Sequence, residues 1–132
     1  MASESSGITS KVAIVIGWVI GGLPTLLMIG TGIGMYVMNP GQMKDGMKQF
    51  GYPENVAIWI VLAEVVSAVL YLIPRTAVLG AILLTGYFGG AVATHVRVND
   101  WKFVIPLIVG IVIWLGLFLR DRRLRELIPF RS

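Results

Sequence analysis

The stretch VAIWIVLAEVVSAVLYLI, residues 56–73, is apolar nearly throughout and carries one carboxylic acid, Glu64, near its middle. A helix rises about 1.5 Å per residue, so a run of this length just crosses a bilayer core of about 30 Å. The pattern therefore predicts a membrane-spanning helix with Glu64 at membrane depth. An ionised carboxylate in hydrocarbon is costly, so we expect Glu64 to face other helices, either protonated or with a partner.

The composition of the whole chain also indicates a membrane protein. Of its 132 residues, 56% are hydrophobic and 14% are charged, and the mean hydropathy is +0.81. A soluble domain of this length has too small an interior to bury so many apolar side chains. We therefore expect one domain, residues 1–132, embedded in lipid. Cysteine is absent, which excludes disulfides, thiolate metal ligands and thiol redox chemistry.

Three further apolar segments predict three more membrane-spanning helices. The four approximate spans are residues 12–38, 56–73, 76–94 and 103–119. The first exceeds the roughly 20 residues that a crossing requires, so we expect it to tilt or to bend at Pro24. The turn at Pro74 and Arg75 is so short that the second and third helices must be antiparallel neighbours. The sequence thus predicts an all-α fold, a four-helix transmembrane bundle.

Two segments outside the spans show helical spacing of apolar residues. Between the first two spans, one helical face would hold Met43, Met47 and Phe50. This spacing predicts a short helix in the headgroup layer, and a disordered loop is the alternative. In the tail RDRRLRELIPFRS, residues 120–132, the corresponding apolar side chains are Leu124, Leu127 and Ile128. We expect this basic amphipathic tail to lie along the membrane surface.

Small and aromatic residues predict how the helices pack and where they meet the interface. Glycine pairs four residues apart, which let two helix backbones approach closely, are Gly17 with Gly21, Gly30 with Gly34, and Gly86 with Gly90. We expect these faces to pack against other helices of the bundle. Aromatic side chains near one interface are Tyr52, Trp59 and Trp101, and we interpret them as membrane anchors.

The basic residues predict the orientation of the chain. With four spans, both termini share a side, which holds seven of the 11 Lys and Arg: Lys11, Arg75, Arg120, Arg122, Arg123, Arg125 and Arg131. The other side holds the remaining four: Lys44, Lys48, Arg97 and Lys102. Short cytoplasmic loops carry the excess of basic residues, so we expect cytoplasmic termini in the plasma (bacterial inner) membrane. Because these residues flank membrane segments, we expect them to meet the lipid bilayer and no nucleic acid.

Glu64 and polar residues on its own helix and on the next helix form the first candidate site. Ser67 and Tyr71 follow Glu64 by three and seven residues, on the same face of the helix. Counting about 1.5 Å per residue from the turn places Thr85 and Tyr87 of the third helix at the same depth. We expect a hydrogen bond between Glu64 and Tyr87. These five residues are a candidate lipophile- or proton-binding site. Alternatively, Glu64 is a protonated acid whose hydrogen bonds join two helices.

A second polar group is expected near the outer surface. By the same count, His95 lies about 15 Å nearer that surface than Glu64. The candidate members of this interfacial cluster are Glu54, His95, Arg97 and Asp100. Anchoring at the headgroups is the alternative role for His95 and Arg97. One histidine and a distant acid do not supply the three or four convergent ligands that zinc needs, so we expect no metal site.

Several motifs follow one another in a characteristic order. They are GYP at residues 51–53, the acid Glu64, LYLIPRTAVLGAILLTGYFGGAVATHVRV at residues 70–98, and WLGLFLRDRRLRELIP at residues 114–129. In this order they resemble the DoxX-like family of small bacterial multi-pass membrane proteins. The resemblance implies a four-helix bundle in the plasma membrane, and it matches the second-span acid and the His-x-Arg of the family to Glu64, His95 and Arg97. The lysine that the family often has near the outer end of the first span is replaced by residues 38–40.

The resemblance also suggests functions. Members of the wider group are associated with thiosulfate:quinone oxidoreduction and oxidative-stress membrane complexes, and remote eukaryotic relatives act as receptor chaperones or cargo receptors. Our first hypothesis is an auxiliary subunit, without catalysis of its own, that binds a quinone or other lipophile near Glu64. Its expected partners are a membrane redox protein or further copies of the same chain. An apolar pocket with a hydrogen-bonding acid suits a quinone carbonyl.

Two other functions remain open. The second hypothesis is a membrane scaffold or chaperone that recruits a partner protein. Glu64→Gln separates it from the first, because this change should abolish lipophile binding but spare partner binding. A proton-coupled transporter is the third hypothesis. Four short helices with one buried acid leave little room for alternating access in a single copy.

Overall fold

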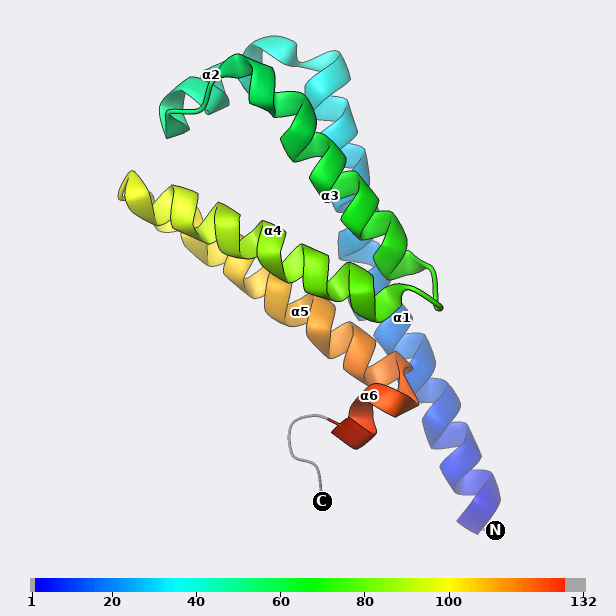
Figure 1. The fold of residues 1–132 in the computed structure, drawn as a ribbon. Coiled ribbons are helices and arrows are strands. Elements are labelled where there is room, and N and C mark those ends of the chain that lie inside the picture. The colour runs from blue at the N-terminus through cyan, green and yellow to red at the C-terminus, as the bar shows by residue number, and fades with distance from the viewer. Residues whose placement is uncertain (1, 128–132) are drawn as a thin grey trace.

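The computed structural model describes residues 2–127, which form helices joined by short turns and no strand (Figure 1). Four helices are long and apolar enough to cross a membrane: Ser10–Met38, Glu54–Leu72, Ala77–Arg97 and Trp101–Arg120. The predicted all-α fold with four spans is therefore confirmed, with ends displaced by up to three residues.

The helices follow one another with little intervening chain. They are α1 (Ala2–Met38), α2 (Pro40–Phe50), η1 (Glu54–Val56), α3 (Ala57–Leu72), α4 (Ala77–Arg97), η2 (Trp101–Phe103), α5 (Val104–Arg120) and α6 (Arg122–Leu127). The long helices pack as the pairs α1/α3, α3/α4, α4/α5 and α5/α1. As the short turn at Pro74 predicts, α3 and α4 are antiparallel neighbours (Figure 1).

The first span remains one continuous helix through Pro24. Proline has no amide hydrogen, so the carbonyl four residues earlier loses its usual helical partner. The next residue, Thr25, is fully buried and donates its hydroxyl to the Gly21 carbonyl at 2.6 Å. The neighbouring turn of α1 thus gains a side-chain hydrogen bond.

The predicted short helix between the first two spans is confirmed as α2. Pro40 stands at its start, where a missing amide hydrogen is harmless, and Gly51 ends it with φ 76°. This left-handed conformation strains other residues but not glycine. Met47 is buried, whereas Lys44 and Lys48 are exposed, so α2 turns an apolar face inward.

The tail forms the short helix α6 as far as Leu127. The carboxylate of Asp121 accepts hydrogen bonds from the amides of Arg123 and Leu124, which caps the start of this helix. Leu124 is buried against the core and Leu127 is exposed. Ile128, the third residue of the predicted apolar face, lies outside the described residues.

One end of the bundle holds the turn from α3 to α4 and the turn from α5 to α6, and we name it the terminal end. The core lies toward this end. Its buried side chains are Tyr71, Ala77, Ala81, Leu84, Phe88, Ile113, Leu117 and Leu124. Of the predicted close-packing glycines, Gly17 and Gly21 of α1 pack against the Gly116 backbone of α5. Apart from the local helix backbone, no described atom lies within 4 Å of a Cβ added at Gly30 or Gly34, so the expected close packing of this pair was wrong. Helix packing is thus tightest at the terminal end.

Arg120 is placed differently from what its position in the sequence suggests. We counted it among the basic residues facing lipid headgroups, but its guanidinium lies between the rings of Trp18 and Tyr71, at 4.0 and 4.5 Å. It also donates to the Tyr71 carbonyl, while its Nε and Nη1 atoms are buried without a partner among the described residues. Arg120 therefore joins α1, α3 and α5 at the terminal end.

Candidate functional site

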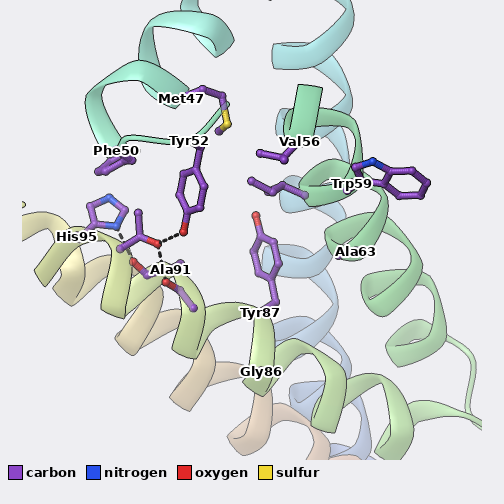
Figure 2. A pocket seen from close by; sticks show the side chains of 13 residues that line it. Met47, Phe50, Tyr52, Val56, Trp59, Ala63, Gly86, Tyr87, Ala91 and His95 are labelled. Atoms are coloured by element: carbon purple, nitrogen blue, oxygen red, sulfur yellow. Dashed lines mark hydrogen bonds between the residues drawn. The ribbon is translucent and has the colours of Figure 1, made fainter. Parts of the chain in front are cut away.

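A cavity of about 500 Å³ lies between α3, α4 and α2 (Figure 2). On this side α3 and α4 diverge from each other (Figure 1). The volume of the cavity is within the range of about 300–1,000 Å³ that is usual for small-molecule sites. Apolar side chains make up most of its wall: Met47, Phe50, Val56, Trp59, Ile60 and Ala63. Its polar side chains are Tyr52, Tyr87, Thr94 and His95.

Small residues of α4 leave room for this cavity. Gly86, Gly90 and Ala91 line it, and apart from the local helix backbone no described atom lies within 4 Å of a Cβ added at either glycine. We expected Gly86 and Gly90 to pack against another helix, but within the described chain they face this open space. The expectation was wrong because α3, the neighbour on this side, diverges from α4.

The predicted hydrogen bond between Tyr87 and Glu64 is confirmed. The Tyr87 hydroxyl donates to Glu64 Oε2 at 3.2 Å, and both side chains are partly buried. A Cβ added to Gly32 of α1 would lie 2.7 Å from the same carboxylate oxygen. Glu64 therefore occupies the junction of α1, α3 and α4 and is not part of the cavity wall. Tyr87 connects this acid to the cavity.

At the α2 end of the cavity, side chains attach the segment after α2 to the last turns of α4. The hydroxyls of Tyr52 and Thr94 are 2.7 Å apart, and the rings of Phe50 and His95 are 4.8 Å apart (Figure 2). Arg97 donates to the Phe50 carbonyl and lies 5.7 Å from the centre of the Tyr52 ring. These contacts complete the cavity wall on the side where α3 and α4 are farthest apart.

The other candidate residues on the helix of Glu64 have separate partners. Ser67 donates to the Ala63 carbonyl at 2.6 Å, within its own helix. Tyr71 is fully buried in the core and donates to the Ile113 carbonyl at 2.7 Å. Of the five candidates, the structure brings only Glu64 and Tyr87 into contact with each other.

Thr85, the fifth candidate, belongs to a different cavity. It lines a space of about 470 Å³ between α4 and α5, together with Gly89 and Trp114. Its hydroxyl accepts a hydrogen bond from the Trp114 indole at 2.7 Å and donates to the Ala81 carbonyl. Thr85 faces away from Tyr87 because residues two apart on a helix point in different directions.

The four polar residues expected near the outer surface do not form one cluster. Glu54 lies 3.8 and 4.0 Å from the ammonium groups of Lys44 and Lys48. Asp100 accepts from the Lys102 amide, at the start of η2. Of the four, His95 lines the cavity and packs against the Phe50 ring, and Arg97 contacts Phe50 and Tyr52 of the cavity wall.

Sequence reasoning missed two polar side chains of the cavity wall. We interpreted Tyr52 as an interfacial anchor and assigned Thr94 no role, yet their hydroxyls meet at the α2 end. The GYP motif at residues 51–53 and the GGAVATHVR run hold both residues. These two motifs were therefore the features of the sequence that could have pointed to Tyr52 and Thr94.

Comparison with known proteins identifies the family. A family model described as the DoxX-like family matches residues 19–116, from α1 into α5. Searches of curated proteins and of solved structures each found no match. The matched segment covers most of the chain and includes the whole cavity wall. With its four spans, the chain is an integral, multi-pass membrane protein, and it belongs to the DoxX-like family.

Proposed function

We propose that this protein is an auxiliary membrane subunit that binds a lipophile, such as a quinone, in the cavity between α2, α3 and α4. The observation that carries this proposal is the composition of the cavity wall, which is apolar except for two tyrosines, a threonine and a histidine. Pockets of this kind bind small molecules by apolar burial and orient them with a few polar groups.

The position of the cavity favours a ligand that is dissolved in the membrane. Its wall comes from two spanning helices and from α2, whose apolar face is turned inward. The cavity has room for a quinone ring and part of its tail, and the ring oxygens would lie beside the hydroxyl groups of Tyr52 or Tyr87. Glu64 would act through Tyr87, whose hydroxyl it holds in place. Catalysis and electron transfer would then belong to a partner in a membrane redox or oxidative-stress complex.

Filling the cavity from α4 tests this proposal. Gly90→Leu extends a bulky side chain from α4 into the cavity, because Gly90 lines the cavity and, apart from its own helix backbone, no described atom lies within 4 Å of an added Cβ. We expect about a 10- to 100-fold loss of affinity for a short-tailed benzoquinone, as overpacking of a filled site would cause. The affinity is measured as saturable binding of the benzoquinone to the protein in lipid nanodiscs. Native mass spectrometry gives the stoichiometry.

Gly89→Leu is the matched control. Gly89 is the neighbouring residue of α4 and lines the other cavity, and an added Cβ there also meets no described atom within 4 Å outside the local helix backbone. The affinity of the Gly89→Leu variant for the same benzoquinone should stay within about twofold of the wild-type affinity. Equal losses in both variants, or no saturable binding to the wild type, would contradict the proposed site and favour a scaffold function.

We also propose that both termini face the cytoplasm of a bacterium, with the protein in the inner membrane. The seven basic residues on the terminal side against four on the other support this orientation.

Because the chain has no cysteine, single introduced cysteines report directly on which side of the membrane each position lies. In spheroplasts, an impermeant maleimide should label Asp45→Cys, and should label Arg123→Cys only after the membrane is permeabilised. Both positions are exposed. The opposite pattern would reverse the orientation.

A further inference from the structure

The hydrogen bond between Tyr52 and Thr94 has a defined direction. Thr94 donates its single hydroxyl hydrogen to the Gly90 carbonyl at 2.8 Å. The 2.7 Å bond between the two hydroxyls must therefore be donated by Tyr52. With its own hydrogen directed at Thr94, the Tyr52 oxygen offers only lone pairs to the cavity.

Tyr87 is arranged in the same way on the other side of the cavity. Its hydroxyl donates to Glu64 Oε2, so the hydrogen points into the helix junction and away from the cavity. Figure 2 shows the two tyrosines entering the same space, Tyr52 from the segment after α2 and Tyr87 from α4. Both phenolic oxygens are thus available to a ligand as hydrogen-bond acceptors.

The remaining polar side chains of the wall add no donor to this space. His95 Nδ1 lies 2.8 Å from the Ala91 carbonyl, which can only accept, so Nδ1 carries a hydrogen, and whenever the ring is neutral Nε2 is an acceptor. The indole of Trp59 points away from the two tyrosines and is 68% exposed (Figure 2). Within the described wall, the polar atoms turned toward the cavity are acceptors.

We propose that this cavity selects lipophiles that carry hydroxyl groups, such as alkylphenols or the reduced, quinol form of a membrane quinone. A hydroxyl ligand can donate to Tyr52 or Tyr87 while both keep their bonds to Thr94 and Glu64. The oxygens of a quinone or an aryl ether only accept, so one tyrosine would have to turn and leave its wall partner unpaired. This inference rests on the proposed function, because it specifies the ligand class of the same cavity.

Four probes compare donors with acceptors of nearly the same shape. They are 4-nonylphenol, its methyl ether 4-nonylanisole, a short-tailed benzoquinone, and the quinol made from it under anaerobic reduction. Binding is measured in nanodiscs, with empty nanodiscs and Gly90→Leu to subtract partition into lipid. We expect the phenol to bind about 10-fold more tightly than the ether, and the quinol about 10-fold more tightly than the quinone, as one hydrogen bond predicts.

Thr94→Val tests the stated cause of this preference. Valine keeps the size of the side chain but removes the acceptor of the Tyr52 hydrogen, which can then be donated into the cavity. We expect the preference for quinol to fall by about 3- to 10-fold, mainly because the quinone binds more tightly. Thr85→Val is the matched control, because Thr85 is on the same helix but lines the other cavity. It should leave the preference unchanged.

The outcomes separate this inference from the proposed function. Saturable binding with equal affinity for hydroxyl and carbonyl probes would overturn the hydroxyl preference and leave the lipophile site standing. Absence of saturable binding for all four probes would overturn the site itself, and the preference with it. An unchanged preference in a folded Thr94→Val variant would overturn the role assigned to the Tyr52 hydrogen.

Discussion

Gly116→Ala is expected to destabilise the protein by about 1–3 kcal/mol, although alanine is the better helix former. A Cβ at this position would lie 2.6 Å from the Gly21 amide nitrogen, 2.7 Å from the Gly21 Cα and 2.9 Å from the Gly17 carbonyl oxygen. All three atoms belong to the backbone of α1, so no side chain can rotate to relieve the contact. Relief requires α1 and α5 to separate, which also disturbs the core at the terminal end.

The free energy of unfolding in a single detergent measures this effect. Gly89→Ala is the matched control on α4, because a Cβ added there meets no part of the described chain within 4 Å beyond its own helix backbone. Alanine at that position should be neutral or stabilise slightly, through its higher helix propensity. A Gly116→Ala variant as stable as Gly89→Ala would contradict the close packing of α1 against α5.

Tyr71→Ala is expected to cost about 3–5 kcal/mol, the usual range for removing a large buried side chain. Tyr71 is 0% exposed and contacts every other spanning helix. It lies against Gly21 of α1 and Gly80 of α4, and its hydroxyl donates to the Ile113 carbonyl of α5 at 2.7 Å. Tyr71→Phe removes only this hydrogen bond and should cost about 1 kcal/mol.

Measuring ligand affinity in Tyr71→Phe separates a structural role from a binding role. The sequence placed Tyr71 in a candidate site with Glu64, but the structure places it in the core and outside the cavity wall. We therefore expect the folded variant to bind a benzoquinone or its quinol as the wild type does. A folded Tyr71→Phe protein that has lost this affinity would return Tyr71 to the ligand site.

Depth along the membrane could be predicted well from sequence alone. The thickness of the bilayer sets the length of a spanning helix, so long apolar runs such as residues 56–73 identify the spans. The short turn at Pro74 and Arg75 then makes residues equally distant from it neighbours in depth. For this reason the Tyr87–Glu64 hydrogen bond was predictable from residue counting.

Rotation about the helix axis and the angles between helices were not predictable in the same way. Ser67 and Tyr71 share a helix with Glu64, and Thr85 was expected at its depth, but each has a partner other than Glu64. Counting residues gives only the position along the helix axis. The direction in which a side chain points relative to the other helices depends on how the helices cross. Gly86 and Gly90 illustrate this, since their spacing predicts close packing but they line a cavity.

The sequence by itself determined the solvent, the four spans, the antiparallel pairing of α3 and α4, and the depth of Glu64, because these depend on local composition and on a short turn. The tertiary structure alone decided that α3 and α4 diverge, that Arg120 packs between Trp18 and Tyr71, and that Tyr52 meets Thr94. Residues 52 and 94 are 42 positions apart. Contacts at such separations depend on the packing of several helices at once, which no local pattern of residues records.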